Sequence, residues 1–205
     1  MRGAQSVLAT LCVICYNGNE VKFLKAVESM KRYIALLRGV NVGGKNKISM
    51  AELKQGFEAI GLDAVRTHLN SGNVAFSGED GEQAARIQTM IRERFGLDVP
   101  VLVVARDWLE DVLRDAPDWW GQGDKEIYDN LILVIPPDTA GDVAERFGEP
   151  TAGLERVCVR AGEIFWSFER KSYAKCSWWK KSASPGIGEC ITIRTANTVK
   201  KLARM

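Results

Sequence analysis

The sequence predicts an α+β fold with two subdomains, of which the first is ferredoxin-like (split β-α-β) and the second is a related α+β half. In the 205-residue chain, short apolar runs alternate with amphipathic helical segments, and residues 33–104 read in the order β-α-β-β-α-β. A similar order recurs after residue 130. We expect an extension over residues 1–29, a first subdomain over 30–116 and a second subdomain over 117–205 with a basic C-terminal segment.

The elements of the first half follow from hydrophobic spacing and turn residues. In order, they are a strand over 33–37, a helix over 50–60, strands over 65–69 and 74–77, a helix over 84–95 and a strand over 99–104. Ser49 and Glu52 form the S-x-x-E pattern of a capping box, and Gly61 ends the first helix. The first two strands of a split β-α-β unit run parallel, so the loop after the first strand and the hairpin turn after the second emerge at one end of the sheet.

The second half is predicted from weaker patterns. After a helix over 108–113 and a loop over 117–130, we expect a strand over 131–135, a helix over 142–147, strands over 157–159 and 164–168, a basic helix from about Ser172, a strand over 191–193 and a terminal helix.

Composition excludes several classes of protein. The longest apolar run, Val7–Tyr16, is about half the length that a bilayer requires, so no membrane association is expected. Five scattered cysteines argue against a disulfide scaffold and favour a reducing, cytoplasmic location. Cys12 and Cys15 form a CxxC pair that lacks a second pair. Because His68 is the one histidine, a histidine-rich metal site is excluded, and we predict no metal.

Residues 1–29 differ from the rest of the chain. Arg2 precedes an apolar stretch as in a short signal sequence, but no A-x-A-like cleavage site follows before Asn17. A start assigned too far upstream, with Met30 as the true first residue, is the simpler interpretation. Intact-mass analysis of the native protein distinguishes the two.

The charge of the chain is asymmetric. Residues 105–149 carry four basic and twelve acidic side chains, whereas residues 170–205 carry nine basic side chains and one acidic. Basic segments often contact phosphates or acidic partners. The alternative is that the two segments face each other or water.

A glycine-rich loop between the first strand and the first helix is the main candidate site. Gly39–Asn46 nearly matches the phosphate-binding pattern G-x-x-x-x-G-K-[ST], but Asn46 replaces the hydroxyl residue and the helix cap lies three residues further on, which argues against a nucleoside triphosphatase. The loop and the hairpin turn together supply Arg38, Asn41, Gly43, Gly44, Lys45, Asn70, Ser71 and Asn73. Cations, amides and exposed glycine backbone suit a small anionic or phosphate-bearing ligand. Alternatively, the asparagines and glycines only form turns, and Arg38 pairs with a carboxylate.

Two other classes of function stay open. The C-terminal region places aromatic residues beside cations, an arrangement suited to single-stranded nucleic acid: Phe165, Trp166, Phe168, Arg170, Lys171, Tyr173, Lys175, Trp178, Trp179, Lys180 and Lys181. Such aromatics more often face a core. A protein-protein interaction domain is the third class. No reaction type, cofactor or oligomeric state follows from the sequence.

Three segments carry a family resemblance: Tyr33–Lys45 (YIALLRGVNVGGK), Met50–Leu53 (MAEL) and Arg66–Val74 (RTHLNSGNV). They resemble the N-terminal signature of family 1697 of the bacterial domains of unknown function. The resemblance implies a two-part α+β fold with a ferredoxin-like half and no established reaction. The family's T-x-R-N-W-N-T-V segment reads TIRTANTV here, so that Arg194 and Asn197 match and Ala196 replaces the tryptophan. Arg194 and Asn197 join the predicted ligand site if this segment folds back onto the loop.

Overall fold

The structure is a computed structural model that describes residues 30–205. The expectations for residues 1–29, including the upstream start and the CxxC pair, lie outside the described residues. In the described part of the chain, no helix has both the length and the apolar character that crossing a bilayer requires.

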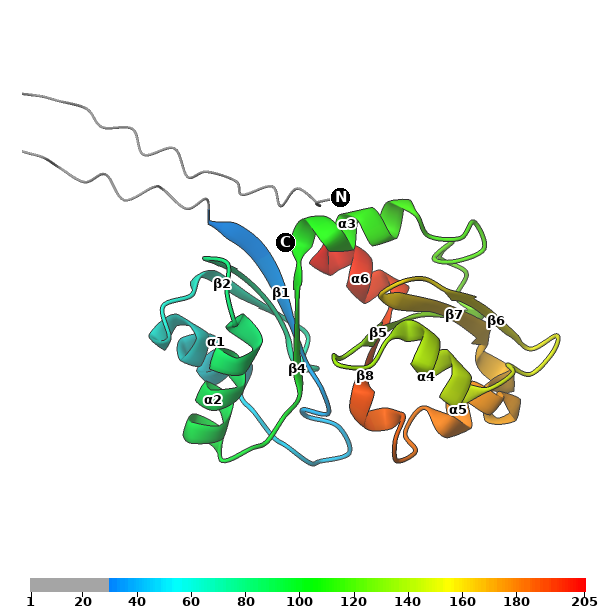
Figure 1. The fold of residues 1–205 in the computed structure, drawn as a ribbon, viewed down its shortest axis with the longest axis horizontal. Helices are drawn as coiled ribbons and strands as arrows, with labels where there is room; N and C mark the ends of the chain where they lie inside the picture. Colours follow the sequence, from blue (N-terminus) through cyan, green and yellow to red (C-terminus); the bar gives the residue numbers. More distant parts are fainter. Residues whose placement is uncertain (1–29) are drawn as a thin grey trace, which may run out of the picture. The chain divides into compact units, whose positions relative to one another are not determined.

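The first half forms an antiparallel sheet of four strands with two helices on one face (Figure 1). Its elements are β1 (Lys31–Leu37), α1 (Met50–Ala59), β2 (Asp63–His68), β3 (Asn73–Gly78), α2 (Gln83–Phe95) and β4 (Val101–Ala105). The strand order β2-β3-β1-β4 is that of the split β-α-β unit, which confirms the ferredoxin-like prediction.

The second half repeats the same topology with the strand order β6-β7-β5-β8. Its elements are β5 (Ile127–Val134), α4 (Ala140–Phe147), β6 (Glu155–Val159), β7 (Glu163–Glu169), β8 (Ile191–Thr195) and α6 (Ala196–Leu202), and α3 (Arg106–Arg114) precedes them. The two-part α+β fold class is therefore confirmed. The boundary between residues 116 and 117 stays a prediction.

The segment between β7 and β8 differs from the single basic helix predicted from Ser172. It contains the 3-10 turn η1 (Arg170–Lys175), the short helix α5 (Ser177–Lys181) and the 3-10 turn η2 (Gly188–Cys190). Cys176 is extended (φ −71°, ψ 128°) and interrupts the helix. The Glu155 carboxylate then accepts the backbone N–H groups of Ser177 and Trp178, at 2.9 and 3.2 Å, and so begins α5 anew.

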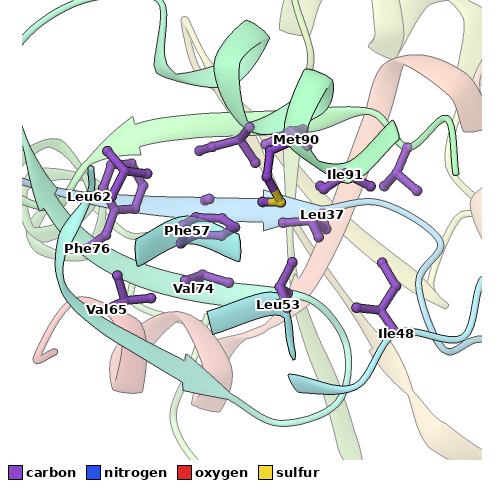
Figure 2. Packing of buried hydrophobic residues seen from close by; sticks show 14 of the residues in the cluster. Leu37, Ile48, Leu53, Phe57, Leu62, Val65, Val74, Phe76, Met90 and Ile91 are labelled. Carbon is purple, nitrogen blue, oxygen red and sulfur yellow. The ribbon is translucent and has the colours of Figure 1, made fainter. Parts of the chain in front are cut away.

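The core of the first half lies between its sheet and its two helices (Figure 2). Leu53 and Phe57 of α1 and Ile91 of α2 are fully buried against it. Ser49 caps α1 by accepting the N–H of Glu52 at 3.5 Å, which is one half of the predicted capping box. The helix cap fixes where the glycine-rich loop ends.

A second cluster joins the two sheets on the faces opposite α1 and α2 in the first half and opposite α4 and α5 in the second. Alternate residues of β1, Ile34 and Leu36, and of β5, Leu131 and Leu133, point into it. The cluster also contains Leu109 and Val112 of α3 and Ala196, Val199 and Leu202 of α6. Figure 1 shows α3 and α6 side by side above the two sheets. This shared core brings β8 close to the loop that follows β1.

Candidate functional site

The glycine-rich loop is attached to the β2-β3 hairpin by one asparagine. The Asn41 side-chain amide donates to the backbone oxygens of Ile48 at 3.0 Å and Asn70 at 2.8 Å, and its oxygen accepts the N–H of Ile48 at 2.9 Å. Asn41 itself has a left-handed backbone (φ 55°), which asparagine tolerates better than most residues. The loop and the hairpin turn therefore lie together, as the split β-α-β topology predicts.

The hairpin turn is held from within by Asn73. This side chain is fully buried and donates to the His68 backbone oxygen at 2.9 Å and to Ser71 Oγ at 3.0 Å. Gly72 has φ +72°, and a Cβ there would lie only 2.5 Å from Val40 Cγ2. Glycine is thus required for the close approach of the turn to the loop.

Arg194 of β8 connects the second half to this turn. Its Nε donates to Asn73 Oδ1 at 2.6 Å, and its Nη2 donates to the backbone oxygens of Leu37 at 2.9 Å and Ser71 at 3.2 Å. Its Nη1 donates to Thr192 Oγ1 at 2.8 Å and to the Ile193 oxygen at 2.9 Å. All five acceptors are neutral.

The Arg194 charge has no carboxylate partner among residues 30–205. Burial lowers the pKa of its guanidinium to about 10, because the charged form loses its hydration. The side chain nevertheless stays protonated at neutral pH. A positive charge therefore lies directly behind the loop and the hairpin.

A shallow cavity of about 490 Å³ opens at the N-terminal end of α1. We call it the loop-hairpin cavity, and its lining residues are Asn41, Gly44, Lys47, Ile48, Ser49, Met50 and Asn70. No acidic side chain lines it. The exposed side chains of Lys45 and Lys47 make no ion pair within the described residues. The lining therefore favours a negatively charged occupant.

The structure brings eight of the ten predicted site residues together at the loop and the hairpin turn. Asn41, Gly44 and Asn70 line the cavity, while Gly43 and Lys45 lie on the adjoining exposed loop. Ser71, Asn73 and Arg194 form the bonded network of the hairpin turn.

The side chains of Arg38 and Asn197 belong neither to the cavity lining nor to the hydrogen-bond network of the hairpin turn. Arg38 Nη2 is close to Gly188, where a Cβ would be 2.9 Å away, and Arg38 forms no ion pair with a described carboxylate. Asn197 is exposed on α6 and its side chain makes no hydrogen bond to the loop or the hairpin.

Sequence reasoning missed Lys47 and Ser49 as lining residues. The signal for both was present, because the Ser49 cap places the residues just before it beside the first turn of α1. It also missed a cavity of about 600 Å³ in the second half, which includes Asp129 and Ser167. The sequence pattern predicts a loop over 117–130, whereas residue 129 lies in β5.

The aromatic basic segment is largely part of the core. Phe165 packs in the cluster shared by the two sheets. Trp166, Phe168 and Trp178 pack in a third cluster, between the second sheet and α4. Tyr173 and Trp179 remain 46% and 41% exposed. Few of the predicted stacking surfaces are therefore accessible to a nucleic acid base.

The acidic and basic segments do not neutralise each other through ion pairs. In residues 30–205, none of the ion pairs joins residues 105–149 to residues 170–205. Lys181 instead donates to the backbone oxygen of Phe147 at 2.5 Å, and Lys200 donates to the backbone oxygen of Gly121. Across the same part of the chain, His, Cys, Asp and Glu side chains form no group of three that could hold a metal ion.

Fold and site together define a two-part α+β protein in which the C-terminal strand of one half secures a loop of the other. The model of the family described as "Protein of unknown function (DUF1697)" matches residues 30–165. The chain belongs to this family.

The chain is similar to a solved structure over most of its length. That structure is described as "The structure of conserved bacterial protein SP0830 from Streptococcus pneumoniae", and it is 28% identical to this chain with a TM-score of 0.74. The similarity covers 86% of this chain and 98% of the other. No curated protein matches the sequence.

Proposed function

We propose that the protein binds a small anionic or phosphate-bearing ligand in the loop-hairpin cavity. The observation that carries this proposal is the lining, which offers Lys47, backbone amides and the N-terminal end of α1 and contains no carboxylate. Lys45 on the adjoining loop adds a second exposed cation. The proposal assigns binding and no reaction.

The first turn of α1 supplies hydrogen-bond donors for such a ligand. The N–H of Glu52 is taken by Ser49, whereas the N–H groups of Met50 and Ala51 have no acceptor among the described residues. A ten-residue helix also carries a partial positive charge at this end. Phosphate oxygens are negatively charged and accept hydrogen bonds, so they suit both the free N–H groups and the partial positive charge.

Asn41, Asn73 and Arg194 act as positioning residues in this proposal. Their polar groups are bonded to protein atoms, so they maintain the loop and the turn. The unneutralised guanidinium of Arg194 also raises the electrostatic potential at the hairpin. Arg38 and Asn197 have no role in it.

Isothermal titration of the full-length protein with inorganic phosphate, pyrophosphate and nucleotides tests the proposal. The double variant Lys45→Ala/Lys47→Ala should weaken binding about tenfold or more, since two charge-assisted contacts are lost. The matched control Lys175→Ala/Lys180→Ala removes two exposed cations from the basic aromatic segment and should leave the affinity within about twofold.

Equal binding by the Lys45→Ala/Lys47→Ala variant would overturn the proposal. Loss of binding in the control variant alone would instead favour the nucleic-acid alternative at Tyr173 and Trp179. A steep linear dependence of log affinity on log salt would accompany that outcome, because binding along a phosphate backbone releases many counterions.

We also place the protein in the cytoplasm. Cys158, Cys176 and Cys190 are free thiols, and Cys176 and Cys190 are buried. Unpaired cysteines are typical of a reducing compartment.

A further inference from the structure

The cavity of about 600 Å³ in the second half is larger than the loop-hairpin cavity and shares no residue with it. Its wall comes from the loop between α3 and β5, and its floor from β5, β6 and β7. A volume of this size is typical of a site for a small molecule.

Three polar side chains form a row across the floor of this cavity. Asp129 of β5 lies opposite Ser167 of β7, and Ser167 lies opposite Arg156 of β6. Directly opposite residues on neighbouring strands project from the same face of a sheet, about 5 Å apart. The row therefore has a carboxylate at one end and a guanidinium at the other.

The Asp129 carboxylate is buried and only half satisfied. The residue is 9% exposed, and its Oδ1 accepts the Ser167 hydroxyl at 2.5 Å. Its Oδ2 has no hydrogen-bond or ion-pair partner among residues 30–205. Asp129 Oδ2 is not fully enclosed by atoms of residues 30–205, so it retains contact with the cavity that Asp129 lines. A buried carboxylate without a cation is costly, so Oδ2 favours a positively charged donor from outside the chain.

The rest of the lining carries a net negative charge and includes an aromatic side chain in the wall. Glu155 is already satisfied by five donors, and Glu169 is paired with Lys171 at 3.5 Å. Asp124 is exposed at the rim. Trp119 is half-buried in the wall, and it can cover an apolar body or a cation.

We propose that this cavity binds a small molecule with a primary ammonium group next to an aromatic or aliphatic body. The ammonium group donates to Asp129 Oδ2, and the body lies against Trp119. Arg156 at the other end of the row adds a preference for amines that also carry a carboxylate, that is, amino acids. This site is independent of the anion site proposed above.

Isothermal titration of the full-length protein with tyramine, and with 4-ethylphenol as its uncharged analogue, tests the proposal. Tyramine should bind and 4-ethylphenol should bind about tenfold more weakly or not at all. Asp129→Asn keeps the shape and the contact with Ser167 but removes the charge, so it should weaken tyramine about tenfold or more. Glu93→Gln, an exposed change of equal charge on α2, should have no effect.

A second variant and a second probe keep the test decisive if Asp129→Asn folds poorly. Trp119→Ala should also weaken tyramine, and Arg156→Gln should weaken phenylalanine while leaving tyramine unchanged. Circular dichroism establishes that each variant is folded. Equal binding of 4-ethylphenol, undiminished binding by folded Asp129→Asn, or no binding of tyramine at about 10 mM would overturn the proposal.

Discussion

The two halves of the molecule have the same strand order but differ between corresponding elements. The first half places the 13-residue helix α2 between its third and fourth strands, whereas the second half places η1, α5 and η2 there. Conversely, the loop after the first strand is long and glycine-rich in the first half, and the corresponding loop after β5 is short. A shared topology therefore leaves room for different sites, because the connections can vary while the sheets are retained.

The second half contributes two charged side chains of opposite sign with matching surroundings, and one of them, Arg194, reaches into the first half. Glu155 accepts five hydrogen bonds from neutral donors of the second half. Arg194 donates five to neutral acceptors, of which three belong to the first half and two to its own strand β8. Neither has an ion-pair partner within residues 30–205. Each charge orders several backbone groups at once, which one ion pair cannot do.

Replacement of Arg194 should have the largest effect. Arg194→Met leaves the backbone oxygens of Leu37 and Ser71 and the side chain of Asn73 without their donor, so we expect a loss of about 3–5 kcal/mol in the free energy of unfolding. Urea denaturation measures it. Arg204→Met, an exposed control, should change the stability by less than about 0.5 kcal/mol. A loss below about 1 kcal/mol for Arg194→Met would show that the network is dispensable.

Replacement of Glu155 should cost about 2–4 kcal/mol. In Glu155→Gln the side-chain NH2 group faces donors, chiefly the N–H groups of Ser177 and Trp178 that begin α5. Thermal denaturation followed by circular dichroism measures the loss, with Glu145→Gln on the exposed face of α4 as the control. Equal melting temperatures for the two variants would contradict the role given to Glu155.

The hairpin glycine should be less tolerant than a loop glycine. Gly72→Ala combines a left-handed backbone with a contact of 2.5 Å to Val40 Cγ2, and we expect a loss of about 2–3 kcal/mol. Gly43→Ala has a similar φ of +57° but no atom within 4 Å, so it should cost about 1 kcal/mol. Urea unfolding compares the two. Equal losses would mean that the close approach of turn and loop contributes nothing.

The smallest effect is a pH dependence from Glu163. Burial raises the pKa of its carboxyl above the usual value and nearby Asp115 adds to this, whereas the N–H of Gly162 and the charge of Arg160 act in the opposite sense. The folded protein therefore retains this proton more strongly than the unfolded chain. The resulting stabilisation is full below about pH 4 and is lost as the pH rises through the raised pKa.

Glu163→Gln removes that loss. The variant should exceed the wild type in stability by up to about 1 kcal/mol at pH 7, and the difference should shrink toward pH 4. Urea unfolding at both pH values measures it. A variant less stable than the wild type at pH 7 would show that the charged carboxylate is stabilising.

Sequence patterns were sufficient for the first half because its local signals agree with its fold. The Ser49 cap, the αL residue Gly96 after α2 and the Asn70–Asn73 turn each mark an element boundary that the structure also has. In the second half the interruption at Cys176 depends on Glu155, which is distant in sequence, so no local pattern predicts it. The hydrogen bonds of Arg194 to the hairpin are equally nonlocal. Arg194, Ser71 and Asn73 could be named from the sequence, but the hydrogen bonds that join Arg194 to the other two could not.

The most direct test of the proposed anion site is amide chemical-shift mapping of the full-length protein during titration with pyrophosphate. The largest shifts should occur at Gly44, Lys47, Met50 and Ala51, and they should be lost in Lys45→Ala/Lys47→Ala. Shifts confined to residues 170–181, or no shifts at any pyrophosphate concentration, would contradict the assignment of the loop-hairpin cavity.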